Sequence, residues 1–124
     1  MMQIIINNSS MVPIYEQIVE QVKKGIRTGQ LKKNDLLPSV RSLSKDLKIS
    51  ALTVKKAYDV LESDGFTITV HGKGSYVAAV NPALLLEEQK KEVETDFERA
   101  IQKGRRYGLS DKEIRSLFDL ILED

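Results

Sequence analysis

The sequence predicts a mainly α-helical fold with one small β-hairpin, in a chain of 124 residues. Three observations support this prediction. Apolar residues recur at helical spacing through most of the chain, two short helical segments are separated only by a tight turn, and an alternating apolar pattern over residues 66–78 surrounds a glycine-rich turn. A chain of this length has room for one modest domain and an appendage.

The first segments are a short strand and a helix. Residues 3–7 are dense in isoleucine and are predicted as a strand. Pro13 is expected to open the helix, because proline is tolerated in the first helical position, and Gly29 is expected to stop it. The apolar stripe of this helix consists of Ile14, Ile18, Val22 and Ile26.

Two further helices follow in quick succession. Ser39 comes directly after Pro38 and is expected to cap a short helix, and Ser50 is expected to cap the next one after a turn at Lys48-Ile49. The inner faces of these helices are formed by Val40, Leu43 and Leu47 and by Val54, Ala57, Tyr58 and Leu61. Two short helices joined by a tight turn are what a helix-turn-helix requires.

A hairpin completes the first part of the chain. Residues 66–70 and 75–78 are predicted as paired strands, and the glycines of the turn between them permit positive φ angles. Helix, helix and hairpin in this order define a winged helix-turn-helix, with the hairpin as a small β-wing. We therefore predict a winged helix-turn-helix DNA-binding domain over residues 1–80.

Residues 81–124 are predicted as a helical dimerisation tail. Asn81 caps a long helix that starts at Pro82 and is expected to run to about Lys103 and to close at Gly104. Ser110 and Glu113 form a capping box for the last helix. The apolar stripes expected to form the interface are Leu86, Val93, Phe97 and Ile101 on the first helix and Ile114, Leu117, Phe118 and Ile121 on the second.

Charge and composition restrict the functional classes. Residues 1–80 carry 11 Lys/Arg against 7 Asp/Glu, and residues 81–124 carry 8 against 11, within a net charge of +1. A basic front favours contact with a polyanion, although an imbalance of this size also arises by chance. The absence of cysteine excludes disulfides and thiolate metal sites. No signal peptide or membrane-spanning segment is found, so we expect a cytoplasmic protein.

Several motifs in one order resemble a known family. They are Pro13–Ile18, Leu37–Leu43, Thr53–Tyr58, Leu61–Gly65 and Gly72–Ala78. Together these segments resemble the GntR family of bacterial transcription regulators, most closely its YtrA-like subfamily, whose short helical tail dimerises the protein. The resemblance implies a homodimer that binds double-stranded DNA, commonly as a repressor and often of membrane-transporter operons.

The resemblance and the chemistry of the side chains suggest the DNA contacts. The N-terminal residues of a recognition helix face base edges in the major groove. By the resemblance, Arg41 would bind a phosphate. Lys73, between two glycines, would lie with the wing over the minor groove. The full set of expected DNA-binding residues is Ser39, Arg41, Ser50, Leu52, Thr53, Lys55, Lys56, Gly72, Lys73 and Gly74. Each also has a plain structural interpretation as a cap, a solvated helix face or a hairpin turn.

The chain departs from the family pattern at three positions. Asn34 stands where the family usually has glycine, and asparagine tolerates the left-handed backbone needed there. Ala51 and Leu52 stand where relatives commonly place arginine or proline and then asparagine. The bases that this protein reads are therefore not predicted.

Two other functional classes remain as alternatives. An enzyme would need catalytic residues, but His71 is the sole histidine and the spacing around Lys73 does not fit a phosphate-binding loop. No catalytic residue, cofactor or metal site is predicted. A winged helix can also act as a protein-interaction module without DNA binding. The tail is too small to enclose a ligand pocket within one protomer. An effector would therefore bind between protomers, or regulation would act through the abundance of the protein alone.

Overall fold

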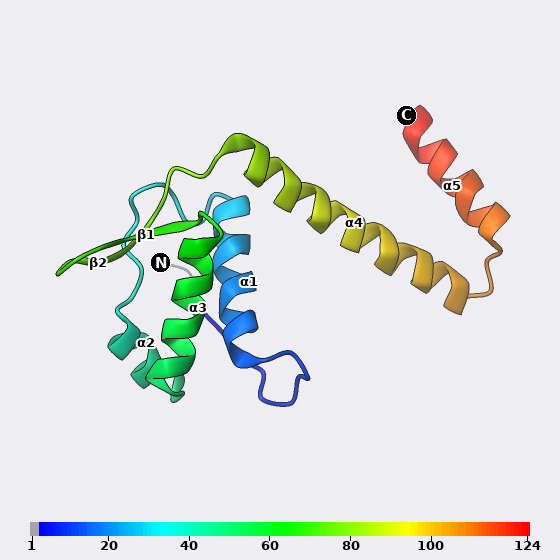
Figure 1. The fold of residues 1–124 in the computed structure, drawn as a ribbon. Coiled ribbons are helices and arrows are strands. Elements are labelled where there is room, and N and C mark those ends of the chain that lie inside the picture. Colours follow the sequence, from blue (N-terminus) through cyan, green and yellow to red (C-terminus); the bar gives the residue numbers. More distant parts are fainter. Residues whose placement is uncertain (1–2) are drawn as a thin grey trace. The chain divides into compact units, whose positions relative to one another are not determined.

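The computed structural model describes residues 3–124, and the chain divides into two compact units, Met1–Leu85 and Leu86–Asp124. The helices are α1 (Ile14–Arg27), α2 (Val40–Leu47), α3 (Ala51–Ser63), α4 (Pro82–Arg106) and α5 (Asp111–Glu123), and the strands are β1 (Thr67–Val70) and β2 (Gly74–Val77). The predicted fold class, mainly helical with a small β-wing, is confirmed (Figure 1).

The first unit is a winged helix-turn-helix around one apolar core. Helices α1 and α2 both pack against α3, and the antiparallel hairpin of β1 and β2 follows α3 in the chain (Figure 1). The largest fully buried side chains come from α1, α3, the hairpin and the residue before it: Ile18, Val22, Val54, Leu61, Phe66 and Val77. The apolar stripes predicted for α1 and α3 are thus the faces that form this core.

Caps and backbone turns follow the sequence closely in this unit. The side chains of Ser39 and Ser50 accept hydrogen bonds from the amides of Ser42 and Leu52, at 3.0 and 3.1 Å, and so begin α2 and α3 as predicted. The turn between the two helices passes through Lys48, whose φ is 56°. Asn34 has a φ of 72°, so it adopts the left-handed conformation expected at that position.

The prediction of a strand over residues 3–7 is wrong. The segment is irregular, and side chains of α1 take the place of a partner strand. The Gln21 side chain accepts from the amide of Ile5 at 2.9 Å and donates to its carbonyl at 2.7 Å, and Gln17 makes the same two contacts with Asn7 at 2.9 and 3.1 Å. The backbone groups are satisfied without a ladder, while Ile4 and Ile6 pack on the core.

The second unit is a helical hairpin closed by a glycine contact. Helix α4 does not end at Gly104 as predicted; it runs to Arg106, and the chain turns at Gly108, whose φ is 87°. Gly104 is buried because α5 lies against it, and a Cβ there would stand 3.3 Å from Ile114 Cδ1. The predicted capping box is present, with Ser110 and Glu113 each accepting from the other's amide at 3.1 Å.

None of the helices in residues 3–124 is long and apolar enough to cross a membrane.

Candidate nucleic-acid interface

Helix α3 has one buried face and one exposed face. Val54, Ala57 and Leu61 point into the core and are completely buried. The opposite face presents Leu52, which is 78% exposed, together with the exposed Lys55 and Lys56. Thr53 lies between the two faces and is half-buried. The residues predicted to read bases are therefore at the N-terminal half of a solvent-facing helix.

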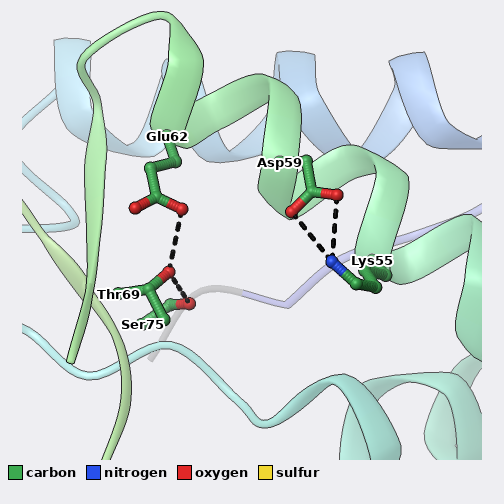
Figure 2. Close-up of polar contacts among 5 residues, drawn as sticks. All are labelled: Lys55, Asp59, Glu62, Thr69 and Ser75. Carbon is green, nitrogen blue, oxygen red and sulfur yellow. Dashed lines mark hydrogen bonds and ion pairs between the residues drawn. The ribbon is translucent and has the colours of Figure 1, made fainter. Parts of the chain in front are cut away.

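Both lysines of this face contact another side chain of the protein. The Lys55 ammonium lies 3.1 and 3.3 Å from the two carboxylate oxygens of Asp59, one helical turn further along (Figure 2). The Lys56 ammonium lies 4.1 Å from the centre of the Tyr15 ring, which belongs to α1. These contacts orient the two charges on the helix surface.

Tyr58 ties α3 to the start of α2. Its hydroxyl donates to the carbonyl of Pro38 at 2.7 Å, so the loop that leads into Ser39 is attached directly to α3. Burial raises the pKa of Tyr58, because the surrounding apolar residues disfavour its charged form. The hydroxyl therefore stays protonated and can donate at any physiological pH.

The N-terminus of α2 offers a second group of polar atoms. Ser39 caps the helix and Arg41 lies in its first turn, where the side chain is exposed. Among the described residues, none forms an ion pair with the Arg41 guanidinium. Unpaired backbone amides and a nearby guanidinium together favour an anion such as a phosphate.

The wing is a hairpin of two four-residue strands with glycines at its tip. Gly72 and Gly74 have φ angles of 78° and 121°, and the Lys73 amide donates to the Val70 carbonyl at 2.9 Å. A Cβ at Gly74 would lie 3.4 Å from Leu36. The loop before α2 runs beside β2, and the Leu37 amide donates to the Ser75 carbonyl at 2.9 Å. The wing is thus supported on its outer edge and exposes Lys73 at its end.

A hydrogen-bonded chain of side chains joins the wing to α3. Thr69 on β1 donates to the Glu62 carboxylate at 3.0 Å and lies 3.4 Å from the hydroxyl of Ser75 on β2 (Figure 2). Sequence reasoning missed Glu62, Thr69 and Ser75, because nothing in a single sequence shows which exposed polar groups meet. It also missed Asp59, although its spacing of four residues from Lys55 is a recognisable helical pair.

The predicted dimerisation residues lie on the second unit. On α4, Leu86, Val93 and Phe97 are each about half exposed, at 51%, 49% and 52%. On α5, Leu117 and Ile121 are 48% and 68% exposed. The remaining three residues pack more within the hairpin: Ile114 is buried, Phe118 meets Phe97 edge-on at 5.6 Å, and Ile101 is half-buried.

A family-level comparison matches residues 14–77 to the bacterial regulatory proteins of the gntR family. The chain belongs to the GntR family. The match covers all of the winged helix-turn-helix from α1 to β2, so the family domain and the candidate interface coincide. The resemblance predicted from sequence is confirmed, and the first unit contains a DNA-binding winged helix of this family.

Individual relatives agree with this assignment. The HTH-type transcriptional repressor YtrA of Bacillus subtilis (strain 168) is 35% identical over 96 residues, which are 77% of this chain and 74% of that protein. A transcriptional regulator from Oenococcus oeni has 30% identity and a TM-score of 0.71, covering 94% of this chain and 97% of that one. The AraR DNA-binding domain in complex with operator ORX1 has 26% identity and a TM-score of 0.55, covering 61% of this chain and 95% of that one.

The similarity to YtrA extends into the tail, because the 96 aligned residues are more than the first unit, Met1–Leu85, contains. The Oenococcus oeni structure likewise aligns over nearly the whole of both chains. This GntR protein is thus a YtrA-like transcriptional regulator, and its relatives are regulators and not enzymes.

Proposed function

We propose that this GntR protein is a homodimeric transcriptional repressor that binds a pseudo-palindromic operator in the cytoplasm and controls a membrane-transporter operon. The observation that supports it best is the exposed N-terminal half of α3, which presents Leu52, Lys55 and Lys56 within a winged helix of the GntR family. AraR has been solved on operator DNA with a similar domain, and YtrA is named a repressor.

The proposed DNA contacts divide by chemistry. Ser39 and Arg41 at the start of α2 bind phosphate, which sets affinity and orientation. Lys73 between Gly72 and Gly74 binds at the minor groove, where glycines allow close approach of the backbone. The major-groove contacts come from the first half of α3: Ser50, Leu52, Thr53, Lys55 and Lys56. Leu52 makes only apolar contact, most usefully with a thymine methyl group.

The proposed dimer is formed by the tail. One short recognition helix reads few base pairs, so two related half-sites are needed for useful specificity. The half-exposed apolar residues of α4 and α5, from Leu86 to Ile121, are the surface that a second copy would cover. The operator would then share the twofold symmetry of the protein.

The deciding experiment is a gel-shift and footprinting assay with the DNA upstream of the protein's own gene. We expect a retarded complex that protects two symmetric half-sites and withstands an excess of scrambled duplex. In an in vitro transcription assay, the protein should lower transcript from that promoter. Failure to retard any duplex would favour the protein-interaction alternative instead.

A further inference from the structure

Asp59 is an acidic residue on the proposed DNA-facing side of the recognition helix. Its carboxylate oxygens lie 3.1 and 3.3 Å from the Lys55 ammonium (Figure 2), and the two side chains are 60% and 62% exposed. Exposed ion pairs of this kind contribute little to folding stability. The Asp59 carboxylate is therefore expected to act on what this face of the helix binds and not on the stability of the fold.

The charges of α3 are unequally distributed along the helix. Lys55 and Lys56 lie in its first half, and Asp59, Glu62 and the C-cap residue Asp64 follow them. The last two acids bond to groups outside α3, since Glu62 accepts from Thr69 and Asp64 pairs with Lys23 at 3.1 Å. Asp59 differs, because its bonded partner among the described residues is Lys55, a proposed DNA contact.

We propose that Asp59 is a specificity-determining residue. Its ion pair with Lys55 keeps the lysine from binding phosphates, and the pair opens where a DNA base offers the Asp59 carboxylate a hydrogen-bond donor. The inference rests on the proposed DNA-binding function. If Lys55 leaves Asp59 to bind a phosphate, the Asp59 carboxylate loses its partner and is repelled by the negative charge of the duplex. In the major groove only cytosine N4 and adenine N6 present amino donors that can compensate it.

The consequence is a difference between DNA sequences. On a duplex without a suitably placed cytosine or adenine, either Lys55 stays on Asp59 and contributes no phosphate contact, or the carboxylate is left uncompensated. On a duplex with such a base, both side chains gain a partner. The pair therefore weakens binding to random DNA more than it weakens binding to the operator.

The test measures binding to a 30-base-pair duplex of scrambled sequence as a function of salt, so that no operator is required. We compare the full-length protein with Asp59→Asn, which keeps the size of the side chain and removes its charge. We expect Asp59→Asn to bind this duplex roughly five- to tenfold more tightly at about 0.1 M salt, with a salt slope steeper by about one unit, because Lys55 becomes a phosphate contact.

Two controls separate this mechanism from a general change in charge. Asp96→Asn removes an acid that pairs with Arg99 at 3.7 Å on α4, and it should leave binding unchanged. In a Lys55→Ala background, Asp59→Asn should lose most of its effect on the slope. Equal gains from Asp96→Asn, or an equal slope change without Lys55, would overturn the inference.

Selection from a random duplex pool gives a second readout. We expect wild-type protein to recover half-sites with a cytosine or adenine at one position that Asp59→Ala, which has no acceptor for their amino groups, no longer selects. Identical selected motifs and identical affinities for the scrambled duplex would refute the role of Asp59 while leaving the proposed function intact. A wild-type protein that binds no duplex at all would instead overturn the proposed function, and this inference with it.

Discussion

The Tyr58 hydroxyl makes a single hydrogen bond whose contribution to stability can be measured. The hydroxyl donates to the Pro38 carbonyl at 2.7 Å and is the contact that joins α3 to the loop before α2. We expect Tyr58→Phe to lower the free energy of unfolding by about 1–2 kcal/mol, because the carbonyl loses its donor in a part-buried place. Denaturant titration measures the change, and Tyr107→Phe, at a side chain 76% exposed, is the matched control with no expected effect.

The same residue predicts a pH dependence. Burial raises the pKa of Tyr58 in the folded protein above its ordinary value. An unfolded tyrosine ionises above about pH 10, whereas the buried one stays protonated, so the unfolded state gains stability as the pH rises. The stabilisation is complete below pH 10 and is lost above it. Wild-type protein should therefore lose stability between about pH 10 and 11 more steeply than Tyr58→Phe does.

Substitution of Arg41 tests the proposed phosphate contact at the start of α2. We expect Arg41→Ala to weaken binding to all duplexes by a similar factor and to flatten the plot of log affinity against log salt by about one unit. Fluorescence anisotropy over a series of salt concentrations measures the slope. Arg99→Ala on α4, in the tail, should leave it unchanged. An unaltered slope in Arg41→Ala would remove this residue from the phosphate contacts.

Single residues were predictable where their role is local. The left-handed Asn34 and the caps Ser39, Ser50 and Ser110 depend on neighbours within a few residues, and the sequence indicates each of them. The exposed contacts were not predictable in the same way. Whether Lys56 extends into solvent or lies over Tyr15 depends on how α1 packs on α3, which no local pattern specifies.

Among the elements, the wing is joined to α3 by a side-chain hydrogen bond. Glu62 accepts from Thr69 and thereby joins α3 to β1. We expect Glu62→Ala to bind DNA about two- to fivefold more weakly than Glu62→Gln, because glutamine retains an acceptor for Thr69 and alanine does not. Both variants are neutral at this position, so their comparison excludes the effect of the lost charge. Anisotropy titration with one operator duplex measures the ratio.

The wing itself is the control for this prediction. If Glu62 acts by positioning the hairpin, the difference between the two variants should vanish when Lys73→Ala removes the charge at the tip. A ratio that persists in the Lys73→Ala background would assign Glu62 to another role.

The predictions of secondary-structure elements and their ends were wrong where tertiary packing decides them. Residues 3–7 have the composition of a strand, but a strand needs a partner, and the glutamines of α1 occupy that place. Glycine commonly ends a helix, but α4 continues through Gly104 because α5 packs where a side chain at this position would project. In both cases the deciding group lies at least five residues away in the sequence.

For the whole molecule, assembly is the property to test. We expect Leu117→Asp to yield monomers that bind operator at least tenfold more weakly, because a charge would be buried in the proposed dimer interface and each protomer would read one half-site alone. Light scattering gives the mass. Ser116→Asp adds the same charge at an exposed neighbouring position of α5 that lies outside the apolar stripe, and it should remain dimeric. A dimeric Leu117→Asp protein would contradict the assignment of this face.

The fold of the whole chain was predictable because its signals are numerous and ordered. Helix, helix, hairpin and tail appear in the sequence in the order in which the structure has them. The proposed interface between copies is less predictable, because an apolar stripe serves intramolecular and intermolecular packing alike. Ile114 and Leu117 belong to one stripe, yet the first is buried against Gly104 and the second is half exposed.

The glutamine contacts of α1 also determine how fast the backbone amides of the first residues exchange with solvent. The amide protons of Ile5 and Asn7 are covered by one side-chain oxygen each and by no backbone ladder. Rotation of Gln17 or Gln21 about its own bonds frees an amide while α1 stays intact. We therefore expect these two protons to exchange with solvent deuterium long before those of Ile18 and Val22. Gln21→Ala should accelerate the exchange at Ile5 and leave the core amides of α1 unchanged.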